Sequence, residues 1–184
     1  MLYTPYAGLS VAADRLVEML DQQGRPLLLV PKQTALARNM PHRVALVILR
    51  ERGGQWWLTR RPRQKPDSQR YWDFSVRGQV LAGEAQTSAA ARLLKEAMGI
   101  PDAQPVLQAV LPPLAFEGAR QCTLFTAVRR GGQVFSRPDG MFVDKDELTG
   151  LAEHFPELLS PCLLWCVQNG YVQGQCVRAP IMLP

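Results

Sequence analysis

The sequence has few of the residues that mark secreted, membrane-bound or metal-stapled proteins. Its 184 residues include only four cysteines and two histidines, and the cysteines form no Cys-x-x-Cys pair. A zinc site is therefore poorly supported. The chain has no run of about eighteen apolar residues and no basic N-terminal stretch before an apolar core, so we expect neither a membrane span nor a secretory signal. A cytoplasmic location follows as the default expectation.

The cysteines that are present favour a role in the core. Cys162 and Cys166 are four residues apart and would share one face of a helix. Thiols of this kind are more often packed in a core than used in redox chemistry or metal binding.

Length and composition are those of a globular protein, with 47% apolar and 20% charged residues. The chain suits one domain over residues 14–170, with an N-terminal extension (1–13) and a C-terminal tail (171–184). The net charge is +5, from 21 basic and 16 acidic residues. The basic excess is concentrated in one stretch: Arg60, Arg61, Arg63, Lys65 and Arg70. Such a patch attracts phosphates, although a solvated loop has the same composition.

Apolar periodicity and turn residues predict a mixture of strands and helices. Strands are expected at 14–20, 26–30, 44–49, 55–59, 71–76, 105–111, 121–128 and 141–143. The first two read as a hairpin, with a helix from residue 10 as the alternative. Helices are expected at 33–39, 86–98, 144–152 and 156–168, and a basic loop at 62–68. The order of strands, helix, strands and helices favours an α+β fold in which helices pack on a mixed sheet.

One spaced pattern carries most of the functional information. Five residues separate Gly78 from Glu84, and seven more separate Glu84 from Arg92; Leu94, Glu96, Gly99 and Ile100 follow in register. This pattern resembles the Nudix hydrolase signature, which is Gly, five residues, Glu, seven residues, then Arg-Glu-apolar-any-Glu-Glu-any-Gly-apolar. The resemblance extends over about residues 14–168 and implies a Nudix-like mixed β-sheet packed between helices, an α/β/α sandwich.

The resemblance also implies a metal site that this sequence has partly lost. A diphosphate repels nucleophiles, and Mg²⁺ or Mn²⁺ held by carboxylates neutralises its charge. In the family the ligands come from the positions of Leu93, Glu96 and Ala97, which share one helix face. Only Glu96 is a carboxylate here. Glu96 is therefore the candidate metal ligand and catalytic residue; the alternative is an exposed side chain paired with Arg92 at i, i+4.

The remaining motif residues have mostly structural roles by resemblance. Glu84 is expected to pair with Arg92 and to shape the loop, and Arg92 joins Glu96 as a candidate catalytic residue. Gly78, Glu84 and Gly99 are the structural residues of the motif. Leu93 and Ala97 would widen the apolar stripe of the helix and partly cover the former metal-binding face.

Other candidates lie outside the motif. Arginine and lysine bind phosphate oxygens, so the candidate substrate-binding residues are Arg60, Arg61, Arg63 and Lys65. Trp72 and Phe74 could stack a base, but core packing is the more frequent use of such residues. We expect His42 to have a surface or capping role. A further acid could compensate for the lost ligands, although exposed loop or helix-start positions are the simpler interpretation for all four candidates: Glu117, Asp144, Asp146 and Glu147.

Within the family, the branch near isopentenyl-diphosphate isomerase is the most similar. His42-Arg43, Arg60-Arg61 and residues 75–79 all resemble it. That enzyme needs a cysteine before the motif glycine and a histidine after it, and this chain has Arg77 and Gln79. We therefore expect no isomerase activity.

Three functions follow from these residues. The first is a Mg²⁺- or Mn²⁺-dependent hydrolase of a nucleoside diphosphate derivative or related diphosphate. The second is a catalytically impaired Nudix module that binds a phosphorylated ligand or a protein partner. Nucleic-acid binding ranks last, because no RNA-binding motif or basic helix supports it. The apolar segment 158–167 suits a homodimer interface as well as a core.

Overall fold

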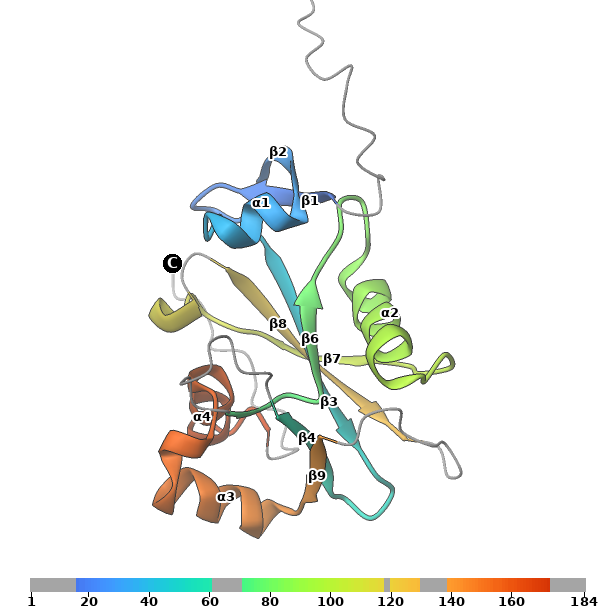
Figure 1. The fold of residues 1–184 in the computed structure, drawn as a ribbon, viewed down its shortest axis with the longest axis vertical. Coiled ribbons are helices and arrows are strands. Elements are labelled where there is room, and N and C mark those ends of the chain that lie inside the picture. The colour runs from blue at the N-terminus through green and yellow to red at the C-terminus, as the bar shows by residue number, and fades with distance from the viewer. Residues whose placement is uncertain (1–15, 61–70, 118–119, 130–138, 173–184) are drawn as a thin grey trace, which may run out of the picture.

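A seven-stranded mixed sheet forms the centre of the protein in the computed structural model, which describes residues 16–60, 71–117, 120–129 and 139–172 (Figure 1). Its strands are β3 (Arg43–Arg50), β4 (Trp56–Arg60), β5 (Trp72–Asp73), β6 (Val76–Gln79), β7 (Val106–Val110), β8 (Gln121–Val128) and β9 (Gly140–Val143). The order is β5-β4-β3-β8-β7, with β6 also paired to β3 and β9 to β4. β3 and β8 are parallel and the other pairs are antiparallel.

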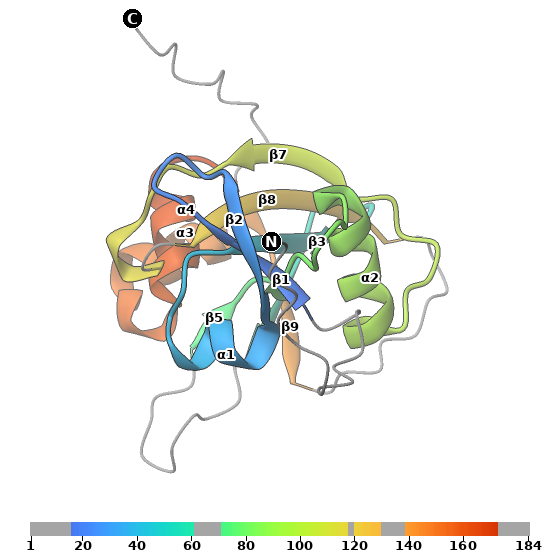
Figure 2. The same ribbon diagram turned by 90° about the horizontal axis from the view of Figure 1, so that it is seen from above.

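Helices cover both faces of this sheet, as the resemblance implied. Helix α2 (Gln86–Met98) lies on one face, and α3 (Lys145–His154) and α4 (Pro161–Gln168) lie on the other (Figure 2). Two short 3₁₀ turns, η2 (Ala115–Glu117) and η3 (Pro156–Leu158), complete the connections. The expected α/β/α sandwich is therefore confirmed. No described helix has both the length and the apolar character needed to cross a membrane.

The central strand β3 explains why two separate cores exist. Its buried side chains alternate between the two faces of the sheet, since successive side chains of a strand point in opposite directions. Val44, Leu46 and Ile48 pack towards α3 and α4. Ala45, Val47 and Leu49 pack towards α2. Each such aliphatic side chain stabilises the fold by roughly 1.5–3 kcal/mol on burial.

A hairpin of β1 (Leu16–Leu20) and β2 (Pro26–Pro31) precedes the sheet, followed by α1 (Lys32–Ala37). It packs around its own small core of Val17, Val30 and Ala35. The Ala82 N–H donates to the Leu16 carbonyl over 2.9 Å, so the hairpin is attached to the loop of the sequence motif.

Two sequence predictions were wrong because a side chain interrupts each predicted element. The single strand 71–76 is two strands, β5 and β6, which pair with different neighbours. Between them Ser75 Oγ accepts a hydrogen bond from the Leu49 N–H over 2.7 Å, in place of regular pairing. The single helix 156–168 is η3 followed by α4. Pro161 disfavours a helical conformation at Ser160, whose side chain caps α4 instead.

Several predicted segments lie outside the described residues. They are the N-terminal extension 1–13, the basic loop 62–68 and all but the first two residues of the tail 171–184.

Candidate functional site

Arg92 and Glu84 hold the loop of the motif in shape. The Arg92 guanidinium donates from Nε and Nη2 to the two Glu84 carboxylate oxygens, each over 2.8 Å. Its Nη2 also donates to the Gln79 carbonyl over 3.0 Å. The Glu84 carboxylate in turn accepts from the Leu81 N–H over 3.0 Å. The pairing expected from the resemblance is therefore present, and it joins the start of the loop to the middle of α2.

These contacts also fix the charge state of the pair. Partial burial opposes ionisation of Glu84, but hydrogen bonds from Arg92 and the Leu81 amide outweigh it and lower the pKa of Glu84. The hydrogen bonds with Glu84 likewise raise the pKa of Arg92. Glu84 and Arg92 bond to each other and to the backbone of the loop, so their role in this structure is to hold the loop in shape.

The two ends of α2 depend on glycine conformations. Gly83, with φ of 73°, lies in the turn before the helix, and Gly99, with φ of 69°, ends it in the left-handed conformation. The Ile100 N–H reaches back to the Leu94 carbonyl over 3.4 Å. A glycine at this position is favoured because other L residues adopt this φ at a cost.

Leu93 occupies the space in front of Gly78. A Cβ placed on Gly78 would lie 2.3 Å from Leu93 Cδ2 and 3.3 Å from Leu93 Cγ. Leu93 is only 7% exposed and belongs to the core on the α2 face, and Ala97 packs against the same core. The expectation that both residues extend the apolar stripe of the helix is confirmed.

This arrangement does not fit a metal ion held by the helix. Hard cations require several oxygen ligands, and of the three ligand positions on α2 only Glu96 offers one. Within the described ranges, no group of three or more His, Cys, Asp or Glu side chains is placed to hold a metal. The donor set for Mg²⁺ or Mn²⁺ implied by the resemblance is therefore incomplete here.

Glu96 makes the contact that its simpler interpretation predicted. Its carboxylate accepts from Arg92 Nη1 over 3.2 Å, and 59% of its side chain is exposed. An exposed pair of this kind contributes little to stability, about 0.3–0.5 kcal/mol. The Glu96 carboxylate therefore has room to contact another partner from the solvent side.

The downstream acids differ from one another. Asp144 caps α3 and forms a reciprocal capping box with Glu147, and Asp146 lies in the first helical turn. These three are exposed helix-start residues, as expected. Glu117 is not: it is 6% exposed, so the prediction of an exposed position was wrong. It is buried because two arginines hold it.

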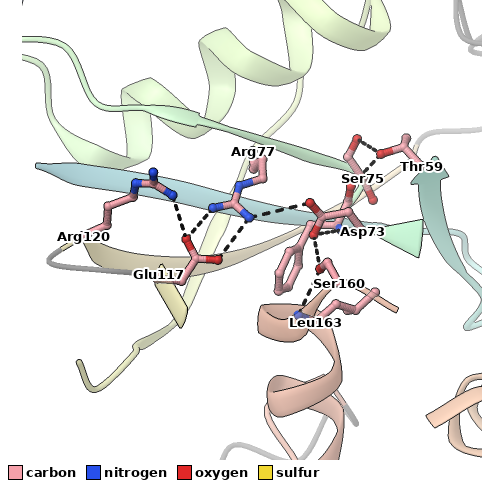
Figure 3. Close-up of polar contacts among 9 residues, drawn as sticks. Thr59, Asp73, Ser75, Arg77, Glu117, Arg120, Ser160 and Leu163 are labelled. Carbon is pink, nitrogen blue, oxygen red and sulfur yellow. Dashed lines mark hydrogen bonds and ion pairs between the residues drawn. The ribbon is translucent and has the colours of Figure 1, made fainter. Parts of the chain in front are cut away.

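Glu117 belongs to a polar network on the face of the sheet that α4 covers (Figure 3). Arg77 donates to its two carboxylate oxygens over 3.2 and 2.7 Å. Arg120 donates to the same carboxylate over 3.4 Å. Arg77 also lies 3.7 Å from the buried Asp73 carboxylate, which accepts from Ser160 Oγ over 2.7 Å. Glu117 is thus committed to arginines and does not replace a lost ligand.

The electrostatics of this network favour the ionised forms. Burial opposes the charge on Arg77, but Asp73 and Glu117 outweigh that effect and raise its pKa. Arg77 and Gly78 are adjacent on β6, so their side-chain positions face opposite sides of the sheet. The network and the Leu93–Gly78 contact are therefore separated by the strand itself.

His42 was expected at the surface or in a cap, and the structure contradicts this: it is fully buried. Its Nδ1 lies 2.6 Å from the Met40 carbonyl, which can only accept, so Nδ1 carries the proton. Burial lowers the pKa of His42, and the positive charges of Arg120 and Arg77 lower it further. The imidazole is therefore neutral at physiological pH.

Of the proposed substrate-binding residues, the structure describes only Arg60; Arg61, Arg63 and Lys65 lie outside the described residues. Arg60 is exposed at the end of β4, and its guanidinium lies over the Trp72 ring, 5.2 Å from the centroid. Phe74 is 1% exposed and packs in the core, as expected.

The thiols are also in the core. Cys162 and Cys166 are buried in α4 and contact the sheet through Cys122. The hydrogen bond with Cys162 and burial raise the pKa of Cys122, so its thiol stays protonated and unreactive. Leu163 and Val167 are buried in the same cluster. The inward face of the segment 158–167 therefore serves the core, and a homodimer interface stays a prediction.

Sequence reasoning missed the Arg77–Glu117–Arg120 arrangement. Only Glu117 was assigned a position, an exposed one, and the three residues are brought together by separate elements, β6, η2 and the start of β8. The one available signal was a charged residue directly before the motif glycine and directly after the predicted strand 71–76.

Comparisons with known proteins agree with this geometry. A family model for the NUDIX domain matches residues 40–157. A curated relative, an uncharacterized Nudix hydrolase from Pseudomonas aeruginosa, is 35% identical over 88 residues. That alignment covers 48% of this chain and 52% of the relative, so it spans about half the length of each protein.

Solved structures show the same fold. DR0079 from Deinococcus radiodurans superposes with a TM-score of 0.67 at 19% identity, over 89% of this chain and 99% of that chain. A MutT protein from Methanosarcina mazei superposes with a TM-score of 0.50 at 16% identity, over 71% of this chain and 94% of that one. At these identities the likeness establishes the arrangement of the sheet and helices.

Proposed function

Because this chain belongs to the NUDIX domain family, we propose that it is a Nudix-type hydrolase with weakened turnover. Its substrate in this proposal is a nucleoside diphosphate derivative or a related diphosphate. We also propose that the chain belongs to the branch near isopentenyl-diphosphate isomerase. It would lack isomerase activity, because Arg77 and Gln79 replace the cysteine and histidine of that enzyme.

The observation that carries the proposal is an intact motif scaffold that presents a single exposed carboxylate. Glu84, Arg92 and Gly99 shape the loop and helix, and Glu96 projects from that helix into solvent. Proteins of this family generally use divalent metal ions, but Leu93 and Ala97 leave the ligand set incomplete. Glu96 is therefore the residue on which remaining turnover would depend, as a proton acceptor for the attacking water. Arg60 would attract the phosphates of the substrate.

A second candidate is a module that binds a phosphorylated ligand and does not hydrolyse it. The packing of Leu93 against Gly78 favours this alternative, because a buried leucine occupies a position where the resemblance implies a metal ligand.

One set of variants separates the two candidates. The protein would be incubated with nucleoside diphosphate derivatives in the presence of Mg²⁺ or Mn²⁺, and released phosphate and nucleotide would be measured. The variants are Glu96→Gln and the double change Leu93→Glu with Ala97→Glu. Lys95→Glu is the matched control, because it adds a carboxylate on the opposite side of the helix.

The proposal predicts slow turnover that Glu96→Gln removes and that the double change raises, while Lys95→Glu leaves it unaltered. Absence of turnover in the native protein, with activity only in the double variant, would establish the binding module instead. Turnover that is insensitive to Glu96→Gln would show that the site lies elsewhere.

A further inference from the structure

The cluster around Glu117 brings His42 and Arg120 together at the start of β3 and β8. The Gln121 N–H donates to the His42 carbonyl over 3.0 Å, and Arg43 and Gln121 are paired in the parallel register. His42 and Arg120 therefore lie beside each other, one residue before the paired strands. Their side chains face the α4 side of the sheet, because they are two residues from Val44 and Cys122, which pack there.

Two buried nitrogen atoms in this cluster have no hydrogen-bond partner among the described residues. They are His42 Nε2 and Arg120 Nε. His42 is 0% exposed, so its Nε2 is enclosed by protein and still unsatisfied. An unpaired buried polar atom costs roughly 1–3 kcal/mol, and two neighbouring ones indicate a partner that supplies hydrogen bonds to both.

A cavity reaches Arg120 from the outside. It has a volume of about 700 Å³ and lies between the β1–β2 hairpin and the segment from β7 to β8. Apolar side chains form much of its wall, including Leu20, Leu27 and Leu111, and Gln121 and Arg120 add polar groups. This is the composition of a small-molecule site, in which a few polar groups orient a mostly apolar contact. Half of the wall comes from the hairpin, which lies before the residues that the NUDIX model matches.

We propose that this cavity binds a small molecule through an oxyanion, a phosphate or a carboxylate, held by Arg120 at the cavity wall and by the buried His42 beside it. In the free protein Glu117 balances the charge of Arg120 and holds its guanidinium in place. Arg77 holds Glu117 from the other side, so it is a positioning residue. The Arg120 Nε–H donates to the oxyanion, and the neutral His42 accepts through Nε2 from a protonated oxygen of the ligand, such as that of a hydrogen phosphate. The site is separate from the helix that carries Glu96, and its test does not require turnover.

The experiment uses the full chain and two simple probes, inorganic phosphate and acetate. The imidazole resonances of His42 and His154 are followed by NMR during titration; His154 is exposed in α3 and is the internal reference. We expect a saturable shift of the His42 resonance and no saturable shift of His154. A His42 shift with phosphate but not with acetate would identify a phosphate site. Equal shifts with both probes would identify a general oxyanion site.

Three variants test the assignment. Arg120→Gln should weaken the binding of the active probe at least tenfold. Arg120→Lys should weaken it less, because lysine keeps the positive charge, but binding should still fall because lysine lacks the Nε donor. Arg25→Gln is the matched control: it removes a cation of the same hairpin that is 74% exposed. Circular dichroism would confirm that each variant is folded.

Either of two results would overturn the proposal. One is a His42 resonance that does not respond to phosphate or acetate, which would leave a buried water as the partner of the two nitrogens. The other is a response that Arg120→Gln and Arg25→Gln reduce equally, which would show non-specific attraction by net charge.

Discussion

Replacing Gly78 by alanine should destabilise the protein through a single contact with Leu93. The added methyl group would lie 2.3 Å from Leu93 Cδ2, 3.1 Å from Cδ1 and 3.3 Å from Cγ. Rotation about the Leu93 Cβ–Cγ bond moves the two methyl groups but leaves Cγ at 3.3 Å, so the whole side chain must also shift by a few tenths of an ångström. Overpacking of this kind costs about 1–3 kcal/mol. For a chain of this size each kcal/mol lowers Tm by roughly 2–4 °C.

A double-mutant cycle isolates that contact. Leu93→Ala alone should cost about 2 kcal/mol or more, since it leaves a cavity beside Gly78. In the double variant the methyl group of the new alanine enters this cavity. The combined cost should therefore be smaller than the sum of the two single costs by about 1 kcal/mol or more. Urea denaturation of the four proteins measures all terms.

Gly150→Ala is the matched control, because a Cβ at Gly150 meets nothing within 4 Å. It lies inside α3, so alanine should be neutral or should stabilise by roughly 0.5–1 kcal/mol. Strict additivity of Gly78→Ala and Leu93→Ala would refute the conclusion that Leu93 fills the space in front of the motif glycine.

Four further predictions concern polar and titratable groups. Arg92→Lys should destabilise the protein by about 1–3 kcal/mol in urea, because lysine cannot make the paired hydrogen bonds to Glu84; an unchanged midpoint would contradict a scaffold role. The lowered pKa of Glu84 adds stability above pH 4.5 that is lost as the pH falls through the folded-state pKa, and Arg92→Lys should reduce this dependence in acid titration. Ser160→Ala should cost about 1–3 kcal/mol, since it removes both the α4 cap and the donor to Asp73, and a loss below 0.5 kcal/mol (about the effect of a neutral surface change) would rule this out. The lowered pKa of His42 implies full stability above pH 6.5 and a Tm that falls as the pH drops through the folded-state pKa; His42→Gln should flatten this profile, and an equal decline in both proteins would assign it to other groups.

Local sequence was sufficient for the elements that depend on their own residues. The bounds of α2 were predicted correctly because helix-forming alanine and leucine fill it and Gly99 ends it. β8 was predicted correctly from its apolar run. One failure came where a distant group decided the outcome: the Ser75 hydroxyl accepts from Leu49 on another strand and separates β5 from β6.

The sequence by itself determined the spacing of the motif and the loss of carboxylates at positions 93 and 97, and its resemblance to the Nudix signature implied the pairing of Glu84 with Arg92. These are properties of residue identity and of helix periodicity. Only the tertiary structure decided that Leu93 is packed against Gly78, and that His42 and Glu117 are buried beside Arg120. Burial and ion pairing depend on which strands meet, and charged residues far apart in the chain carry no local signal of the partner that will neutralise them.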